Sequence, residues 1–361
     1  MMKKINKKKI GIMSMQRIIN YGSFLQAYGL YTTIKKLGYE VEFIDFHYYG
    51  SLVEEKNESI AKKIFRNLNV IKFLKKRKII RSFRRQIVDN FSKLNISDKP
   101  NYSHNIDVLV IGSDEVFNCI QGYPVGYSLD LFGKGYEDKK VISYAASFGH
   151  TDINKLKLYN KENEISNCLK KFKAISVRDE NSRDIVKELC NKNPVVNLDP
   201  VLISDFDINK TKEIAIQDYI IVYAYSGRLS KEEERYIKSF AKRHNKKIVS
   251  IGFYQRIADY NLSVSPFDVM SYFKKADYVI TDTFHGTIFS IKSNTKFCTI
   301  IRDSNRNKLK SLLNKLNQEK RIVDNLNDIE NLYNMEIDFT NTNQIIKEET
   351  KKTIDYLKNN L

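Results

Sequence analysis

The chain has 361 residues, 42% of them hydrophobic and 29% charged, which is typical of a folded globular protein and excludes disordered, collagen-like and low-complexity classes. At about 100–200 residues per domain, two domains are expected. Lys and Arg number 61 against 43 Asp and Glu, and the net charge of +18 indicates an anionic partner: a phosphate-bearing substrate, a membrane surface or nucleic acid. An A+T-rich genome, which favours Lys and Asn codons, is the alternative explanation.

The first elements form a β-loop-α-β unit. Residues 10–13 predict a short strand, apolar residues at helical spacing from Phe24 to Leu37 predict a helix ended by Gly38, and residues 41–46 predict a second strand. Short connections of this kind predict a parallel sheet covered by helices.

Residues 51–96 differ in composition. Between Ala61 and Arg85 there are eleven Lys or Arg and no acid, interleaved with apolar residues. This pattern predicts basic amphipathic helices inserted between strands. Two interpretations stay open: peripheral contact with an anionic membrane surface, or a solvated helical insertion packed on the domain.

Strands and helices then alternate to the end of the chain. Strands are predicted at 107–112, 141–146, 174–177, 195–198, 219–225, 247–251, 277–281 and 297–301, and helices at about 155–172, 180–189, 230–244, 266–275, 285–292, 307–316 and 342–360. The fold class is therefore α/β, with two Rossmann-like doubly wound domains facing across a cleft. The predicted parts are 1–202 with the insertion at about 51–96, a polar linker at 203–217, a second domain at 218–340 and a C-terminal helix at 341–361.

Several sequence patterns are absent. No GxGxxG follows the first strand, and there is no GxxxxGK[ST], HExxH or GxSxG, so no cofactor or metal is expected. Asp205-Phe206-Asp207 is interpreted as a solvated turn. The start of the chain does not resemble a signal peptide, and no run of about 18 apolar residues predicts a membrane span. The four cysteines are far apart in the sequence: Cys119, Cys168, Cys190 and Cys298. Together, these observations predict a cytoplasmic location, peripheral at the inner membrane face if the insertion binds lipid.

His285 is the strongest candidate for chemistry. It follows a strand and opens a helix, where an α/β cleft places reactive groups, and a histidine there can move a proton near neutral pH. The alternative is a histidine that only caps or packs. Arg178 directly follows strand 174–177, where its fork can bind phosphate or carboxylate, or pair with Asp179 or Glu180 at the surface.

Two strand-end turns add polar groups. Asn20-Tyr21-Gly22-Ser23 offers free backbone amides to an anion or to sugar hydroxyls, or is an ordinary helix cap. Ser113, Asp114 and Glu115 follow strand 107–112, where an acid either binds acceptor hydroxyls or caps the next helix.

Together these pieces resemble the polysaccharide pyruvyl transferase family. The matching segments follow the family's order across about residues 10–315: 20–28 (NYGSFLQAY), 107–115 (DVLVIGSDE), 142–149 (ISYAASFG), 176–182 (SVRDENS), 199–200 (DP) and 277–286 (DYVITDTFHG). The resemblance implies a glycosyltransferase-B-type fold without a metal. It implies transfer of the pyruvyl group of phosphoenolpyruvate onto two hydroxyls of a sugar or lipid-linked oligosaccharide, forming a ketal in a capsule, exopolysaccharide or cell-wall polymer.

The resemblance also assigns residues. His285 would be the general acid/base, and Arg178 would hold the phosphate or carboxylate. Many family members carry Arg where this chain has Thr283, so the phosphate clamp is built differently or the donor differs, and Arg302 and Arg306 are the expected substitutes. The full set of expected substrate-binding residues is Asn20, Tyr21, Gly22, Ser23, Ser113, Asp114, Asp282, Thr283, Gly286, Arg302 and Arg306.

Two other functions stay open. An inverting glycosyltransferase of the same two-domain build would use a nucleotide-sugar donor, and titration with UDP-sugars would distinguish it. A non-enzymatic binder of nucleic acid or an anionic surface would depend on residues 61–85 and show a steep salt dependence. Because the basic stretch contains no recognised binding module, no nucleic-acid partner is expected.

Overall fold

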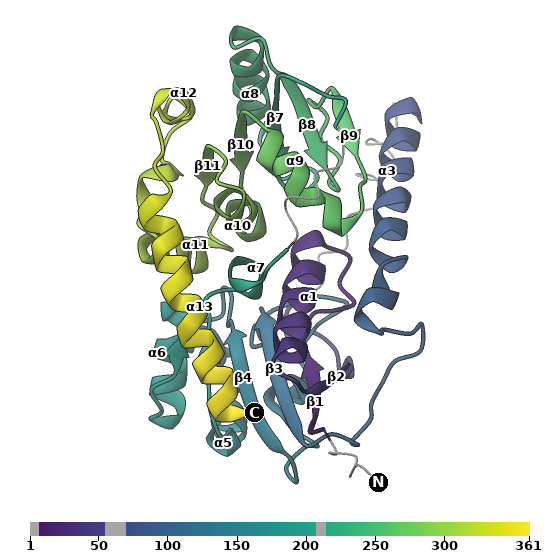
Figure 1. The fold of residues 1–361 in the computed structure, drawn as a ribbon, viewed down its shortest axis with the longest axis vertical. Helices are drawn as coiled ribbons and strands as arrows, with labels where there is room; N and C mark the ends of the chain where they lie inside the picture. The colour runs from purple at the N-terminus through teal and green to yellow at the C-terminus, as the bar shows by residue number, and fades with distance from the viewer. Residues whose placement is uncertain (1–6, 55–69, 207–213) are drawn as a thin grey trace, which may run out of the picture.

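The computed structural model describes residues 7–54, 70–206 and 214–361, and contains two parallel six-stranded sheets with helices on their faces (Figure 1). The predicted fold class, two Rossmann-like domains, is confirmed. The first sheet has the order β2-β1-β3-β4-β5-β6. Its strands are β1 (Lys9–Met13), β2 (Glu40–Phe43), β3 (Val108–Asp114), β4 (Lys140–Ala146), β5 (Ser176–Val177) and β6 (Val195–Val196).

The second sheet has the order β12-β11-β10-β7-β8-β9. Its strands are β7 (Tyr219–Tyr223), β8 (Lys247–Ile251), β9 (Tyr260–Leu262), β10 (Tyr278–Thr281), β11 (Phe297–Ile300) and β12 (Ile322–Val323). In each sheet the strand order reverses at one point, the switch point. It lies between β1 and β3 in the first sheet and between β7 and β10 in the second. A parallel sheet of this kind binds ligands at such a switch point, outside the carboxyl ends of its strands.

The helices agree with the sequence pattern in most places. They are α1 (Tyr21–Lys36), α3 (Val70–Val88), α4 (Ile153–Leu158), α5 (Glu162–Lys171), α6 (Glu180–Cys190), α7 (Pro200–Ile203), α8 (Lys231–Arg243), α9 (Val269–Lys275), α10 (Phe284–Lys292), α11 (Arg306–Lys315), α12 (Asp328–Asn334) and α13 (Thr340–Asn360). The single helix predicted at 155–172 is wrong. Asn160 adopts a left-handed φ of 55° between α4 and α5, which ends the first of two helices.

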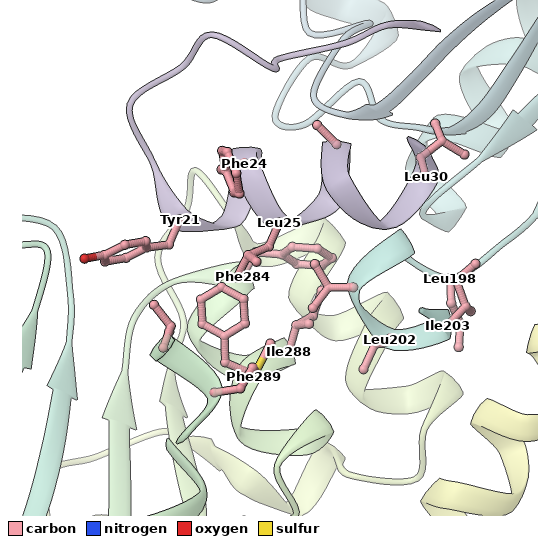
Figure 2. Packing of buried hydrophobic residues seen from close by; sticks show 14 of the residues in the cluster. Tyr21, Phe24, Leu25, Leu30, Leu198, Leu202, Ile203, Phe284, Ile288 and Phe289 are labelled. Carbon is pink, nitrogen blue, oxygen red and sulfur yellow. The ribbon is translucent and has the colours of Figure 1, made fainter. Parts of the chain in front are cut away.

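One apolar core is shared by the two domains. Leu25 of α1 lies next to Phe284 of α10, with Phe289 and α7 nearby (Figure 2), and Tyr21 and Phe24 of α1 belong to the same cluster. All of these side chains are at most 5% exposed. Each Å² of apolar area buried in this core contributes roughly 25 cal/mol to the free energy of folding. Because the core contains side chains of both domains, it holds the two sheets in a fixed relation.

Helix α13 follows the second domain but packs on the first (Figure 1). The hydroxyl of Tyr356 donates to the carbonyl of Ser143 at 2.8 Å, and Asn197 Nδ2 donates to Thr353 Oγ1 at 3.2 Å. The hydroxyls of Tyr144 and Thr353 lie 3.3 Å apart. The predicted C-terminal helix therefore completes the helical cover of the N-terminal domain.

Helix α3 also contacts both domains. The ring of Phe83 lies 4.7 Å from Tyr21 and 5.6 Å from Phe253, and Ser263 Oγ donates to the carbonyl of Ile79 at 3.2 Å. One face of the basic insertion is therefore packed on the protein. The part of that insertion at 55–69, and Asp207 of the Asp-Phe-Asp sequence, lie outside the described residues.

Within the described ranges, no helix is both long and apolar enough to cross a bilayer, and no group of His, Cys, Asp and Glu side chains suits a metal ion. The four cysteines are free thiols.

Candidate active site

A cleft of about 200 Å³ lies where the switch points of the two sheets face each other. Its lining comes from the segments that follow the carboxyl ends of β1, β3, β4, β7, β10 and β11: Asn20, Ser23, Asp114, Glu115, His150, Tyr225, Arg228, Thr283, Phe284, His285, Ser304, Asn305 and Lys308. The predicted residues Asn20, Ser23, Asp114, Thr283 and His285 are thus brought together from both domains.

His285 lies in the first turn of α10. Thr283 is the N-cap of this helix and accepts a hydrogen bond from the backbone N–H of Gly286 at 2.9 Å. The imidazole packs directly on α1, because a Cβ atom on Gly22 would come within 2.1 Å of His285 Nδ1. Only glycine at position 22 leaves room for this ring.

A buried carboxylate stands behind the imidazole. Asp199 Oδ2 lies 3.5 Å from His285 Nε2, and Asp199 Oδ1 accepts from the backbone N–H of Val201 at 3.0 Å as the cap of α7. Burial alone would raise the pKa of Asp199, but the neighbouring His285 and Arg178 charges lower it overall. An ionised Asp199 therefore lies beside the imidazole of His285.

Arg178 lies beneath the cleft and does not line it. Its Nη1 donates to Asp199 Oδ2 at 2.8 Å, its Nη2 donates to Asp114 Oδ1 at 3.3 Å, and its guanidinium stacks 4.3 Å from the Phe284 ring centre. The side chain is 2% exposed. This geometry does not support the predicted fork onto phosphate or carboxylate, because both terminal nitrogens are already bound by carboxylates.

The N-terminal wall of the cleft is acidic. Asp114 Oδ2 accepts from Ser23 Oγ at 2.9 Å, and Glu115 pairs with Lys308 from the opposite domain. Burial would raise the pKa of both acids, but Arg178 lowers that of Asp114 and Lys308 lowers that of Glu115, so both stay ionised. The predicted polar rim after β3 is therefore present as a pair of carboxylates.

The C-terminal wall supplies cations that the sequence analysis missed. Arg228, in the segment after β7, donates to Ser304 Oγ at 2.6 Å and lies 3.4 Å from Asp282. Lys308 of α11 completes this wall. Both follow strand ends, and the position of Arg228 after the first strand of the second half was the one available sign, since that strand borders the switch point.

Asn20 links the two walls directly. Its Oδ1 caps α1 by accepting from the backbone N–H of Gly22 at 2.8 Å, and its Nδ2 donates to the hydroxyl of Tyr225 at 3.2 Å. Tyr225 and His150 were also missed by sequence reasoning. Burial lowers the pKa of His150, which favours its neutral form in the cleft.

Arg302 and Arg306, the expected substitutes for an arginine at position 283, do not line the cleft. Arg302 is held by both oxygens of Glu233, at 2.7 and 3.0 Å, and by Asp282 at 3.1 Å. Arg306 is half exposed and pairs with Asp303 at 3.0 Å. The structure offers Arg228 and Lys308 in their place.

The other predicted residues support the cleft from below. Their side chains or backbones are buried and lie outside its lining: Tyr21, Gly22, Ser113, Asp282 and Gly286. The Tyr21 hydroxyl donates to the carbonyl of Val264 at 2.7 Å, which ties α1 to the second domain. Burial raises the pKa of Asp282 despite its two arginine neighbours.

The two Rossmann-like domains with a cleft between them are a fold of the glycosyltransferase-B type. A model of the polysaccharide pyruvyl transferase family matches residues 20–304, and the chain belongs to that family. A search of curated protein sequences gave no match.

Solved structures share the fold at low sequence identity. Arabidopsis thaliana UGT89C1, complexed with UDP-L-rhamnose, is 10% identical at a TM-score of 0.50, with 97% of this chain and 98% of that chain covered. Methanocaldococcus jannaschii UDP-GlcNAc 2-epimerase, in complex with UDP-GlcNAc and UDP, is 12% identical at a TM-score of 0.49, with 96% and 99% covered.

Proposed function

We propose that this protein transfers the pyruvyl group of phosphoenolpyruvate onto two hydroxyls of a sugar, forming a cyclic ketal during synthesis of a surface polysaccharide. The observation that carries the proposal is the His285–Asp199 pair at the edge of a cleft whose facing walls carry opposite charge. Membership of the polysaccharide pyruvyl transferase family supports a pyruvyl-transfer reaction.

The donor would bind the cationic wall. Phosphoenolpyruvate carries a phosphate and a carboxylate, and Arg228 and Lys308 supply two positive side chains in the cleft. The N-terminus of α10, at His285, adds the positive end of a helix dipole. Arg228 and Lys308 would then do what an arginine at position 283 does in other family members.

The proton transfers fit a histidine backed by a carboxylate. A proton added to the methylene carbon of the donor leaves an oxocarbenium-like centre, which the first sugar hydroxyl attacks with loss of its proton. Phosphate leaves with the bonding electron pair and the second hydroxyl closes the ketal. The proton of one hydroxyl returns to the general acid and replaces the proton that it gave to the methylene carbon. The proton of the other hydroxyl leaves with the phosphate. His285 would donate and recover the proton, with the Asp199 carboxylate 3.5 Å from its Nε2.

The acceptor would bind the acidic wall. Asp114 and Glu115 are ionised acceptors that can receive hydrogen bonds from sugar hydroxyls and orient the pair that is attacked. Lys308 would move from Glu115 to the incoming anion, which frees that carboxylate for the sugar.

The test is phosphate release from phosphoenolpyruvate with a panel of lipid-linked and nitrophenyl sugars, for wild type and His285→Ala. We expect acceptor-dependent release that falls by about 10²–10⁴-fold in the variant. His244→Ala is the matched control, because His244 pairs with Glu330 away from the cleft. Absence of release and of donor binding, together with binding of a UDP-sugar, would favour a nucleotide-sugar glycosyltransferase instead.

A further inference from the structure

Helix α3 presents one face to the protein and one to solvent. Phe83 and Ile87 are buried against the domains, at 5% and 0% exposure. The opposite face is exposed and basic over most of its length: Lys75, Arg77, Lys78, Arg81, Arg84 and Arg85. None of these six side chains forms an ion pair with a carboxylate among the described residues.

Large apolar side chains are exposed on the same helix. Phe73, Leu74 and Ile80 are 38%, 57% and 45% exposed. Residues 73, 77, 80 and 84 recur at three- and four-residue spacing, so apolar and basic side chains share one stripe. The Arg77 guanidinium lies 5.4 Å from the Phe73 ring centre, which shows how closely the two kinds of group are interleaved.

This combination favours a lipid surface. An amphipathic helix at a bilayer interface buries apolar side chains at the acyl boundary, while long Lys and Arg side chains reach the headgroups. Anionic headgroups attract basic residues within about 10 Å. Nucleic acid would use the charge but would leave the exposed Phe73, Leu74 and Ile80 without an apolar partner.

We propose that the outer face of α3 is a docking surface for an anionic membrane leaflet. The inner face of α3 contacts both domains through Phe83 and Ile79, so docking through this helix would hold the whole enzyme at the surface. Sugar acceptors linked to lipid are concentrated there. The proposal does not depend on phosphoenolpyruvate as donor, because binding to vesicles is measured without substrate.

The experiment is flotation of the full-length protein with phosphatidylcholine vesicles that contain or lack phosphatidylglycerol. Arg77, Lys78, Arg81 and Arg84 are replaced together by Gln. We expect wild-type protein to float only with anionic vesicles, and the quadruple variant to bind them up to about a thousandfold more weakly. Phe73→Ser with Leu74→Ser should weaken binding by about tenfold, because it removes the apolar contribution.

A matched control removes the same charge elsewhere. Lys231, Arg235, Lys238 and Lys242 are exposed on α8, and their replacement by Gln should leave vesicle binding unchanged. Equal loss in this control would overturn the proposal, since net charge alone would then explain binding. The proposal would also be overturned if the wild-type protein did not bind anionic vesicles. It would likewise be overturned if the wild type bound RNA more tightly than vesicles and the α3 variant lost RNA binding to the same extent. Phosphate release by the α3 variant with a water-soluble acceptor should be unchanged. This measurement distinguishes a loss of membrane binding from a failure of the proposed reaction.

Discussion

The two walls of the cleft carry opposite charge, and each belongs to a different domain. The N-terminal wall contributes Asp114 and Glu115, whereas the C-terminal wall contributes Arg228, Lys308 and His285. Buried between them, Arg178 is neutralised by Asp114 and Asp199 and reaches neither wall's surface. The basic residues near the cleft therefore differ in position: Arg178 is buried among carboxylates, whereas Arg228 and Lys308 line the cleft while they pair with Asp282 and Glu115.

The largest expected effect tests this difference through Arg178. Arg178→Ala leaves Asp114 and Asp199 buried without their cation, and we expect a loss of about 3–5 kcal/mol in the free energy of unfolding, measured in urea. Arg306→Ala, which removes a half-exposed pair, should cost less than about 1 kcal/mol. A stable Arg178→Ala protein with a raised KM for the donor would return Arg178 to direct anion binding.

A smaller effect tests the contact between α1 and the imidazole of His285. Gly22→Ala puts a methyl group where the His285 ring lies, so the ring must move and kcat should fall about a hundredfold. Gly122→Ala is the control, because no atom lies within 4 Å of the added methyl group. Equal activity of the two variants would show that the observed position of His285 is not needed for turnover.

The cationic wall is tested by Arg228. Arg228→Ala should raise the KM for phosphoenolpyruvate by about tenfold while the KM for the sugar changes little, because one charge-assisted contact to the anion is lost. Asp114→Asn should show the opposite split, raising mainly the KM for the sugar. Steady-state kinetics with each substrate varied in turn measure both constants, and a rise in the same constant for both variants would refute the division between the walls.

The smallest expected effect lies away from the cleft, where α10 meets α7. Burial lowers the pKa of Lys292 to about 8, and its Nζ donates to the carbonyl of Leu202 at 2.8 Å. Between this value and the ordinary lysine pKa of about 10.4, the unfolded chain binds more protons than the folded one, so stability rises with pH. From about pH 7.5 to 9.5 the wild type should gain about 1–2 kcal/mol relative to Lys292→Met. Parallel pH profiles for the two proteins would contradict this.

The sequence predicted the strands and the place of His285 because both depend on local patterns. The apolar runs that became β3, β4, β7 and β10 are continuous, and His285 follows one of them directly. The short strands β9 and β12 and the helix α12 were missed, because so few residues carry no clear periodicity.

The partners of charged residues were not predictable in the same way. Arg178 was placed correctly after its strand, but its carboxylates lie 21 and 64 residues away in sequence. Arg228 and Lys308 are two among 61 Lys and Arg residues, and only the position of Arg228 after a strand that borders the switch point set either apart. Their function depends on which loops meet across the domains, which only the assembled fold determines.

The packing of α13 on the N-terminal domain has a consequence for how the chain folds during synthesis. Tyr356 and Thr353 satisfy Ser143, Tyr144 and Asn197 in the first domain, yet they leave the ribosome after the entire second domain. These partners in the first domain therefore lack α13 through the translation of about 150 further residues, roughly 8–30 s at about 5–20 residues per second.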